Sequence, residues 1–78
     1  MAHTSQDELD QTITAAEQVE VGGVYFHYKN PENFYIVNSI ALIESNQEVA
    51  VVYQALYGKE ITWIRPLEEF LKKFTLVK

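Results

Sequence analysis

The chain has 78 residues, no cysteine and a formal net charge of -5 at pH 7. This length fits one small domain, and a chain without cysteine has no thiolate nucleophile, no cysteine-based zinc site and no disulfide. No apolar run approaches the roughly 20 residues that a membrane-spanning helix needs, and the polar, acidic N-terminus does not resemble a secretory signal. We therefore expect a soluble, cytoplasmic protein that does not enter a membrane.

The negative charge is concentrated in residues 1–20, which hold five acidic residues and no lysine or arginine. From Val21 onward six acidic side chains balance six basic ones, so this larger part of the chain is neutral. Domains that bind nucleic acid usually carry a basic surface, because phosphate contacts supply most of their affinity. The charge distribution therefore argues against nucleic acid as the partner.

Residues 1–20 form an acidic leader that we interpret either as a short helix or as a disordered segment. Ser5 and Glu8 fit a capping box at the start of a helix. The apolar face that follows is thin, however, and poor helix formers interrupt it. Both alternatives stay open, and we assign the folded domain to residues 21–78.

Beyond the leader, the sequence predicts short strands separated by tight turns, because β-branched and aromatic residues alternate with turn-forming residues. The expected strands cover residues 24–28, 34–44, 49–57 and 61–65, and the expected turns cover residues 30–33, 45–47 and 58–60. The second and third strands are apolar on both faces. Such strands belong in a closed barrel, beneath a helix or at an oligomer interface.

A C-terminal helix is predicted to start at Pro66, which suits the first helical position because proline lacks an amide donor. Leu67, Phe70, Leu71 and Phe74 then recur at the spacing of one helix face. Pairs of opposite charge four residues apart should support this helix. The expected pairs are Glu68 with Lys72 and Glu69 with Lys73.

Four or five short antiparallel strands followed by a helix indicate a mainly β fold. The best match is a small antiparallel barrel of the Src-homology-3 type (SH3-like), with a short C-terminal α-helix and with the longer strands bent to serve two sheets. A flat sheet with one helix across it is the main alternative.

Three sequence motifs also resemble those of a known family. They are YFHYK at residues 25–29, VVYQALY at residues 51–57 and WIRPLEEF at residues 63–70. In this order they resemble the bacterial family catalogued as domain of unknown function 1653, from about Gly22 to Phe74. The chain departs from the family at Asn30, where a glycine is usual, and at residues 41–43, where Ala-Leu-Ile replaces an Ala-Arg-His pattern. The resemblance implies a small, compact bacterial domain and brings no established activity.

Six residues are candidates for a ligand-binding groove. Small barrels lined by tyrosine and tryptophan hold extended peptides, arginine binds carboxylates and phosphates bidentately, and histidine titrates near neutral pH. The candidates are His27, Tyr53, Gln54, Tyr57, Trp63 and Arg65.

Each candidate also has a structural interpretation. His27 can be hydrogen-bonded between strands, the aromatic rings can belong to the core, and Gln54 can be a satisfied buried amide. Arg65 can form an ion pair with a carboxylate such as Glu68 or Glu44.

The sequence contains no catalytic constellation. Its serines lack the setting of a nucleophile elbow, and glycine-rich phosphate loops and clustered metal ligands are absent. We therefore expect no enzymatic activity, no cofactor and no metal. The favoured hypothesis is a non-catalytic binding module that uses an aromatic and polar groove for a peptide or an anionic small ligand. The alternative is a homodimeric assembly domain, joined through the doubly apolar strands and the terminal helix.

Overall fold

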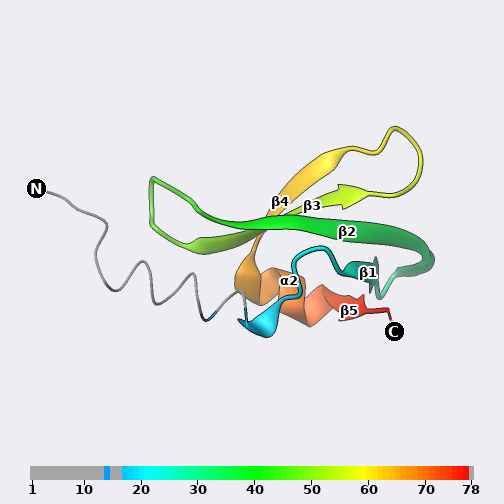
Figure 1. Ribbon diagram of the computed structural model, residues 1–78, viewed down its shortest axis with the longest axis horizontal. Coiled ribbons are helices and arrows are strands. Elements are labelled where there is room, and N and C mark those ends of the chain that lie inside the picture. Colours follow the sequence, from blue (N-terminus) through cyan, green and yellow to red (C-terminus); the bar gives the residue numbers. More distant parts are fainter. Residues whose placement is uncertain (1–13, 15–16, 78) are drawn as a thin grey trace, which may run out of the picture.

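The computed structural model describes Thr14 and residues 17–77 (Figure 1). No helix in this part of the chain is long and apolar enough to cross a membrane. The elements, in chain order, are β1 (Val24–His27), β2 (Asn30–Leu42), β3 (Val49–Ala55), β4 (Thr62–Pro66), α2 (Leu67–Lys73) and β5 (Phe74–Leu76).

The five strands form one antiparallel sheet in the order β4-β3-β2-β1-β5. The long strand β2 serves both neighbours, since Ile36 pairs with Val24 of β1 and Leu42 pairs with Val49 of β3. Helix α2 packs against one side of the sheet and connects its two outer strands (Figure 1). The mainly β class with five antiparallel strands and one short helix is confirmed. Closure into a barrel stays a prediction, because β4 and β5 stand at opposite ends of the hydrogen-bonded order.

The first turn is shorter than the sequence indicated. The chain reverses at Tyr28 and Lys29, so that β2 already begins at Asn30. The backbone amide of Lys29 donates to Nδ1 of His27 at 3.1 Å and closes this tight turn. Residues 31–33, which we had assigned to the turn, lie instead at the start of β2, where the register with β1 shifts.

Helix α2 is shorter than predicted as well. Pro66 ends β4 and acts as the N-cap of the helix, and Phe74 has the extended backbone of a strand, with φ -119 and ψ 144. Residues 74–76 therefore leave the helix and pair with β1, where Thr75 stands opposite Phe26. This pairing forms the fifth strand.

The core is built mainly from aromatic rings. The fully buried ring of Phe70 stacks on Phe74, with 4.4 Å between the centroids and 6° between the planes. Tyr25 meets Phe70 edge-on at 5.1 Å, and Tyr53 meets it at 5.3 Å. Aromatic side chains bury about 150–250 Å² each, so this group supplies much of the hydrophobic stabilisation. The other buried members are Val19, Val37 and Val51.

Val19, which lies in the predicted leader, is fully buried in the core. The chain then turns at Gly23, where an added Cβ would lie 2.9 Å from the carbonyl oxygen of Glu20. Such an approach is too close for any other residue without a shift of the backbone. The capping box predicted at residues 5–8 lies outside the described residues.

Truncation of Phe70 tests the aromatic core. We expect Phe70→Ala to lower the free energy of unfolding by about 3–5 kcal/mol. This loss equals what the whole core of so small a chain supplies, so the variant should be largely unfolded even without urea. Urea denaturation followed by circular dichroism measures the loss. Leu71→Ala, in the same helix but 40% exposed, is the matched control and should cost about 1 kcal/mol or less. Equal losses would contradict a core centred on Phe70.

Candidate functional site

A pocket of about 210 Å³ receives side chains from all five strands. Four of the six residues singled out by the sequence line it together, and three further residues complete it. The four are His27, Tyr53, Trp63 and Arg65, and the three are Asn30, Tyr35 and Phe74.

Strand register explains why these side chains meet. Trp63 pairs with Tyr53 across β3 and β4, and Arg65 lies two residues further along β4, so all three side chains share one face of the sheet. At the other end of the strand order, Phe74 of β5 pairs with His27 of β1. The turn of the chain through α2 thus places the two ends of the sheet at one pocket.

The guanidinium of Arg65 is held in place from three directions. Its Nε donates to the hydroxyl of Tyr53 at 3.1 Å, its Nη1 donates to Oε1 of Glu69 at 3.3 Å, and its Cζ lies 5.7 Å from the centroid of Phe74. The hydrogen bond to Tyr53, followed by the negative charge of Glu69, raises the pKa of Arg65 above its usual value. A guanidinium carries five N–H donors, and these two bonds use two of them.

The carboxylate beside Arg65 differs from those we expected. Glu69 takes this place instead of Glu68 or Glu44, and it bonds to Arg65 rather than to Lys73. Arg65 and Glu69 are four residues apart across the start of α2, which brings their side chains together. The pair stabilises the fold by about 0–1 kcal/mol at most, because it is exposed to solvent. Its main effect is to orient the guanidinium.

His27 has a lowered pKa and a hydrogen bond that defines the tautomer of its neutral ring. Its ring meets Phe74 edge-on at 5.0 Å and stacks on Tyr28 at 4.9 Å. Because Nδ1 accepts a hydrogen bond from the Lys29 amide, the proton of the neutral ring resides on Nε2. Burial of the ring, and then the positive charge of Arg65, lowers the pKa of His27 from its usual 6.5. The sequence had suggested a hydrogen bond of His27 between strands. The bond that His27 forms lies instead within its own turn.

Two tyrosines form a hydrogen-bonded pair beside the pocket. The hydroxyls of Tyr35 and Tyr57 are 2.7 Å apart, and the ring of Tyr35 meets that of Tyr53 at 5.5 Å. Burial and the bond to Tyr57 raise the pKa of Tyr35 to about 12, so its hydroxyl keeps its proton. Tyr57 is 42% exposed and supports Tyr35 without lining the pocket itself.

Gln54 is separated from the other candidates. It follows Tyr53 in β3, and neighbouring residues of a strand point to opposite faces. Its Nε2 donates to the carbonyl of Glu60 at 3.1 Å and closes the turn between β3 and β4. This contact supports the hairpin and takes Gln54 out of the site.

The sequence pattern missed Asn30, Tyr35 and Phe74. We had assigned Asn30 to a turn and Phe74 to the face of a helix. Tyr35 lies in a strand that is apolar on both faces, where composition does not distinguish the two faces. The only available signal was that Tyr35 lies two residues from Val37 and therefore shares its face of the strand. The structure shows that the side chain of Val37 is buried in the core.

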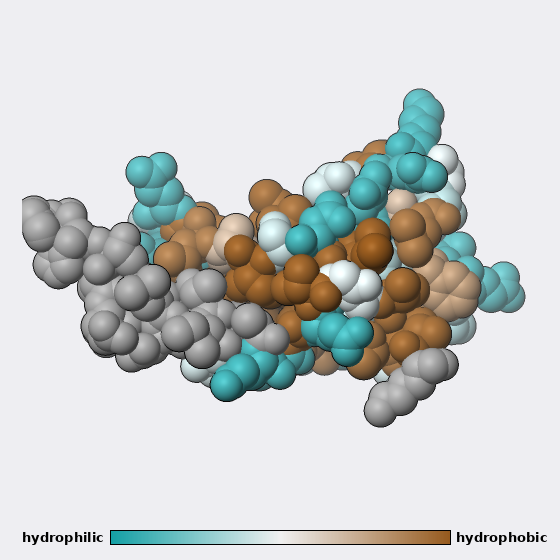
Figure 2. Space-filling view, in the orientation of Figure 1, coloured by the Kyte–Doolittle hydropathy of each residue, from teal (hydrophilic) through white to brown (hydrophobic). Residues whose placement is uncertain are grey.

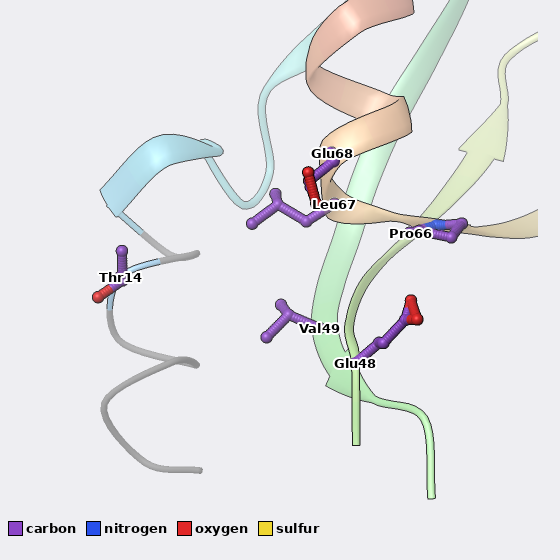
Figure 3. Close-up of a pocket in the computed structure, with 6 residues that line it drawn as sticks. All are labelled: Thr14, Glu48, Val49, Pro66, Leu67 and Glu68. Carbon is purple, nitrogen blue, oxygen red and sulfur yellow. The ribbon is translucent and has the colours of Figure 1, made fainter. Parts of the chain in front are cut away.

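A second pocket, of about 340 Å³, shares no lining residue with this site. The side chains of Val49 and Leu67 project toward Thr14, and Glu48 and Glu68 also line the pocket (Figure 3). Its walls combine apolar side chains with two carboxylates, and the described lining residues supply neither an aromatic ring nor a cation. We assign the candidate site to the first pocket, which Tyr53, Trp63 and Arg65 line and which we call the aromatic pocket.

Metal ligands do not gather in the described part of the chain, where no three histidine, aspartate or glutamate side chains come together.

Residues 23–77 match the family described as Protein of unknown function (DUF1653). This chain belongs to that family. The match includes every residue that lines the aromatic pocket of this DUF1653 domain. Comparisons with curated proteins and with solved structures found no match.

The effect of the positive charge of Arg65 on the pKa of His27 can be tested by titration. We expect the pKa of His27 in this DUF1653 domain to lie below 6.5 and to rise in Arg65→Gln, because the substitution removes a cationic neighbour. NMR of the labelled imidazole as a function of pH measures both values. Lys59→Gln removes a charge from the β3–β4 turn and should leave the pKa unchanged. Equal changes in the two variants would indicate a general charge effect in place of a local contact.

Proposed function

We propose that this DUF1653 domain is a non-catalytic binding module whose pocket holds the anionic group of a peptide or small ligand. The observation that carries the proposal is the guanidinium of Arg65, which Tyr53 and Glu69 orient while its remaining N–H donors stay available at the pocket wall. Fixed arginine side chains of this kind bind carboxylates and phosphates in a bidentate manner. The cysteine-free composition supports a cytoplasmic location for this module.

The charge around the pocket supports an anionic ligand. Arg65, Lys73 and Lys29 all lower the pKa of His27 through their positive charge, so the three cations lie close to the pocket although the chain as a whole carries -5. A neutral hydrogen-bond donor, the hydroxyl of Tyr53, stands beside these cations. The hydroxyl of Tyr53 accepts a hydrogen bond from Arg65, and a phenol O–H is also a donor.

The size of the pocket limits what it can hold. Pockets for whole small molecules usually measure about 300–1,000 Å³, and this one measures about 210 Å³. A single carboxylate or phosphate group fits such a volume, and the rest of the ligand would then lie outside. Trp63, which is 49% exposed at the pocket wall, offers an aromatic surface for that part.

A homodimeric assembly domain is the second candidate function. Ile61 and Ile64 expose half or more of their surface beside Trp63, and apolar residues also gather over the middle of the face seen in Figure 2. Exposed apolar patches often mark interfaces between proteins. Sedimentation at two protein concentrations separates the two functions, because a strict monomer removes the assembly domain.

Sulfate is a suitable probe for the anion site. We expect sodium sulfate, at constant ionic strength against sodium chloride, to shift the amide NMR signals of His27, Asn30 and Arg65 and the indole signal of Trp63. Arg65→Gln should weaken the response at least tenfold, since hydrogen bonds to charged groups contribute about 1.5–3 kcal/mol. Lys59→Gln removes the same charge outside the pocket and should bind as the natural chain does. Equal binding by both variants would contradict the proposed site.

The affinity for sulfate should also depend on pH. As the pH falls through the lowered pKa of His27, the ring gains a positive charge and sulfate, which keeps its own charge, binds more tightly. Bound sulfate in turn raises the pKa of His27. Titrations at pH 5 and pH 8 measure the change, and His27→Gln should remove it. A dependence on pH that survives in His27→Gln would assign the effect to another group.

A further inference from the structure

Strand β4 is an edge of the sheet that carries little protection. It stands at one end of the strand order, has Arg65 as its only charged residue, and exposes Trp63 and Ile64 by 49% and 63%. Natural edge strands usually carry charges, prolines or bulges that prevent another strand from pairing with them. In β4 such protection is limited to Arg65, whose side chain lines the pocket, and to Pro66 at the last position. Open edges of this kind accept extended peptides as additional strands.

The backbone groups that face the open edge follow from the pairing with β3. The amide of Ala55 donates to the carbonyl of Ile61 at 3.0 Å, and the direction of the backbone groups alternates along an antiparallel strand. Ile61 and Trp63 therefore direct their N–H and C=O groups toward β3. Thr62 and Ile64 direct theirs toward the open edge, where an added strand would bond to them.

The side chains of β4 alternate in the same way, so that Trp63 and Arg65 line the pocket and the residues between them face the opposite side. A residue of the added strand opposite Arg65 would place its Cβ about 4.5–5.5 Å away. An acidic side chain there reaches the guanidinium donors that Tyr53 and Glu69 leave available. The residue two positions away lies beside Trp63, where an apolar side chain covers the indole ring.

We propose that β4 accepts an extended acidic peptide as a sixth strand, with an acidic side chain at Arg65 and an apolar side chain two positions away on Trp63. This inference rests on the proposed function, because the acidic side chain is the anionic group that the pocket holds. It adds the class of the partner and the way in which its backbone binds.

A second copy of the chain fits the same edge less well. Its β4, Thr62–Pro66, contains no carboxylate and would bring another Arg65 toward a region that is already positive. Pro66 also lacks the amide that a paired strand would need at that position. Charge complementarity therefore favours a peptide that supplies the missing carboxylate.

The test uses the full chain and the peptide acetyl-Thr-Leu-Thr-Glu-Thr-Leu-Thr-amide. Leucine stands two positions from glutamate on both sides, so the peptide fits either strand direction. Trp63 is the only tryptophan, and its fluorescence should shift to the blue as the ring is covered. The amide NMR signals of Thr62 and Ile64 should shift together with it. Replacement of the glutamate by glutamine should weaken binding at least tenfold.

A second comparison separates strand addition from simple binding of an anion. N-methylation of the two threonines beside the glutamate keeps the carboxylate but removes the amides that pair with β4 if the added strand is antiparallel. N-methylation of the glutamate and the two leucines removes those that pair if it is parallel. One of these two methylated peptides should bind at least tenfold more weakly than the parent peptide. Ile64→Pro removes an amide that faces solvent, so the fold and sulfate binding should survive while peptide binding is lost. If this variant does not fold, binding of the two methylated peptides to the unsubstituted chain tests strand addition.

Three outcomes would overturn the inference. Equal binding of both methylated peptides excludes strand addition but leaves the sulfate site and the proposed function intact. If the glutamine peptide binds as tightly as the glutamate peptide and sulfate produces no response, both the inference and the proposed function are wrong. A concentration-dependent dimer that Ile64→Pro abolishes assigns the edge to a second copy of the chain.

Discussion

The ring of Phe74 is the contact on which both the core and the pocket depend. It stacks on Phe70 in the interior, and it also receives the edge of His27 and the guanidinium of Arg65. A chain of this size without disulfides draws only about 3–5 kcal/mol from its core, so it has few buried rings to spare. The same ring therefore stabilises the fold and forms a wall of the pocket.

Helix α2 is what makes this double use possible. Arg65 lies just before the helix and Phe74 directly follows it, at the beginning of the strand that pairs with β1. The helix carries the chain from one outer strand of the sheet to the other, and residues nine positions apart thus meet at one site. Lys73 at the end of the helix and Lys29 in the first turn approach the same place. A positive region arises in this way on a chain whose net charge is negative.

The fold class followed from the sequence because each strand carried its own local signal. Alternating and β-branched residues marked four of the five strands, and the spacing of Leu67, Phe70 and Phe74 marked the helix region. The short strand that begins at Phe74 carried no separate signal, since its first residue continues the helical spacing. The sequence placed the first turn too late, because Pro31 is typical of turns and the bond between Lys29 and His27 cannot be read from a pattern.

The sequence by itself determined the class of the fold, the family and the residue types suited to binding an anion. Four of its six candidates, Arg65 among them, line one pocket. Only the tertiary structure decided that Gln54 faces away, that Glu69 pairs with Arg65, and that Asn30 and Tyr35 complete the wall. The physical reason is that a period of two fixes the face of a residue within its own strand. Which residues stand opposite depends on the register between strands, and that is set by turns, bulges and packing across the whole sheet.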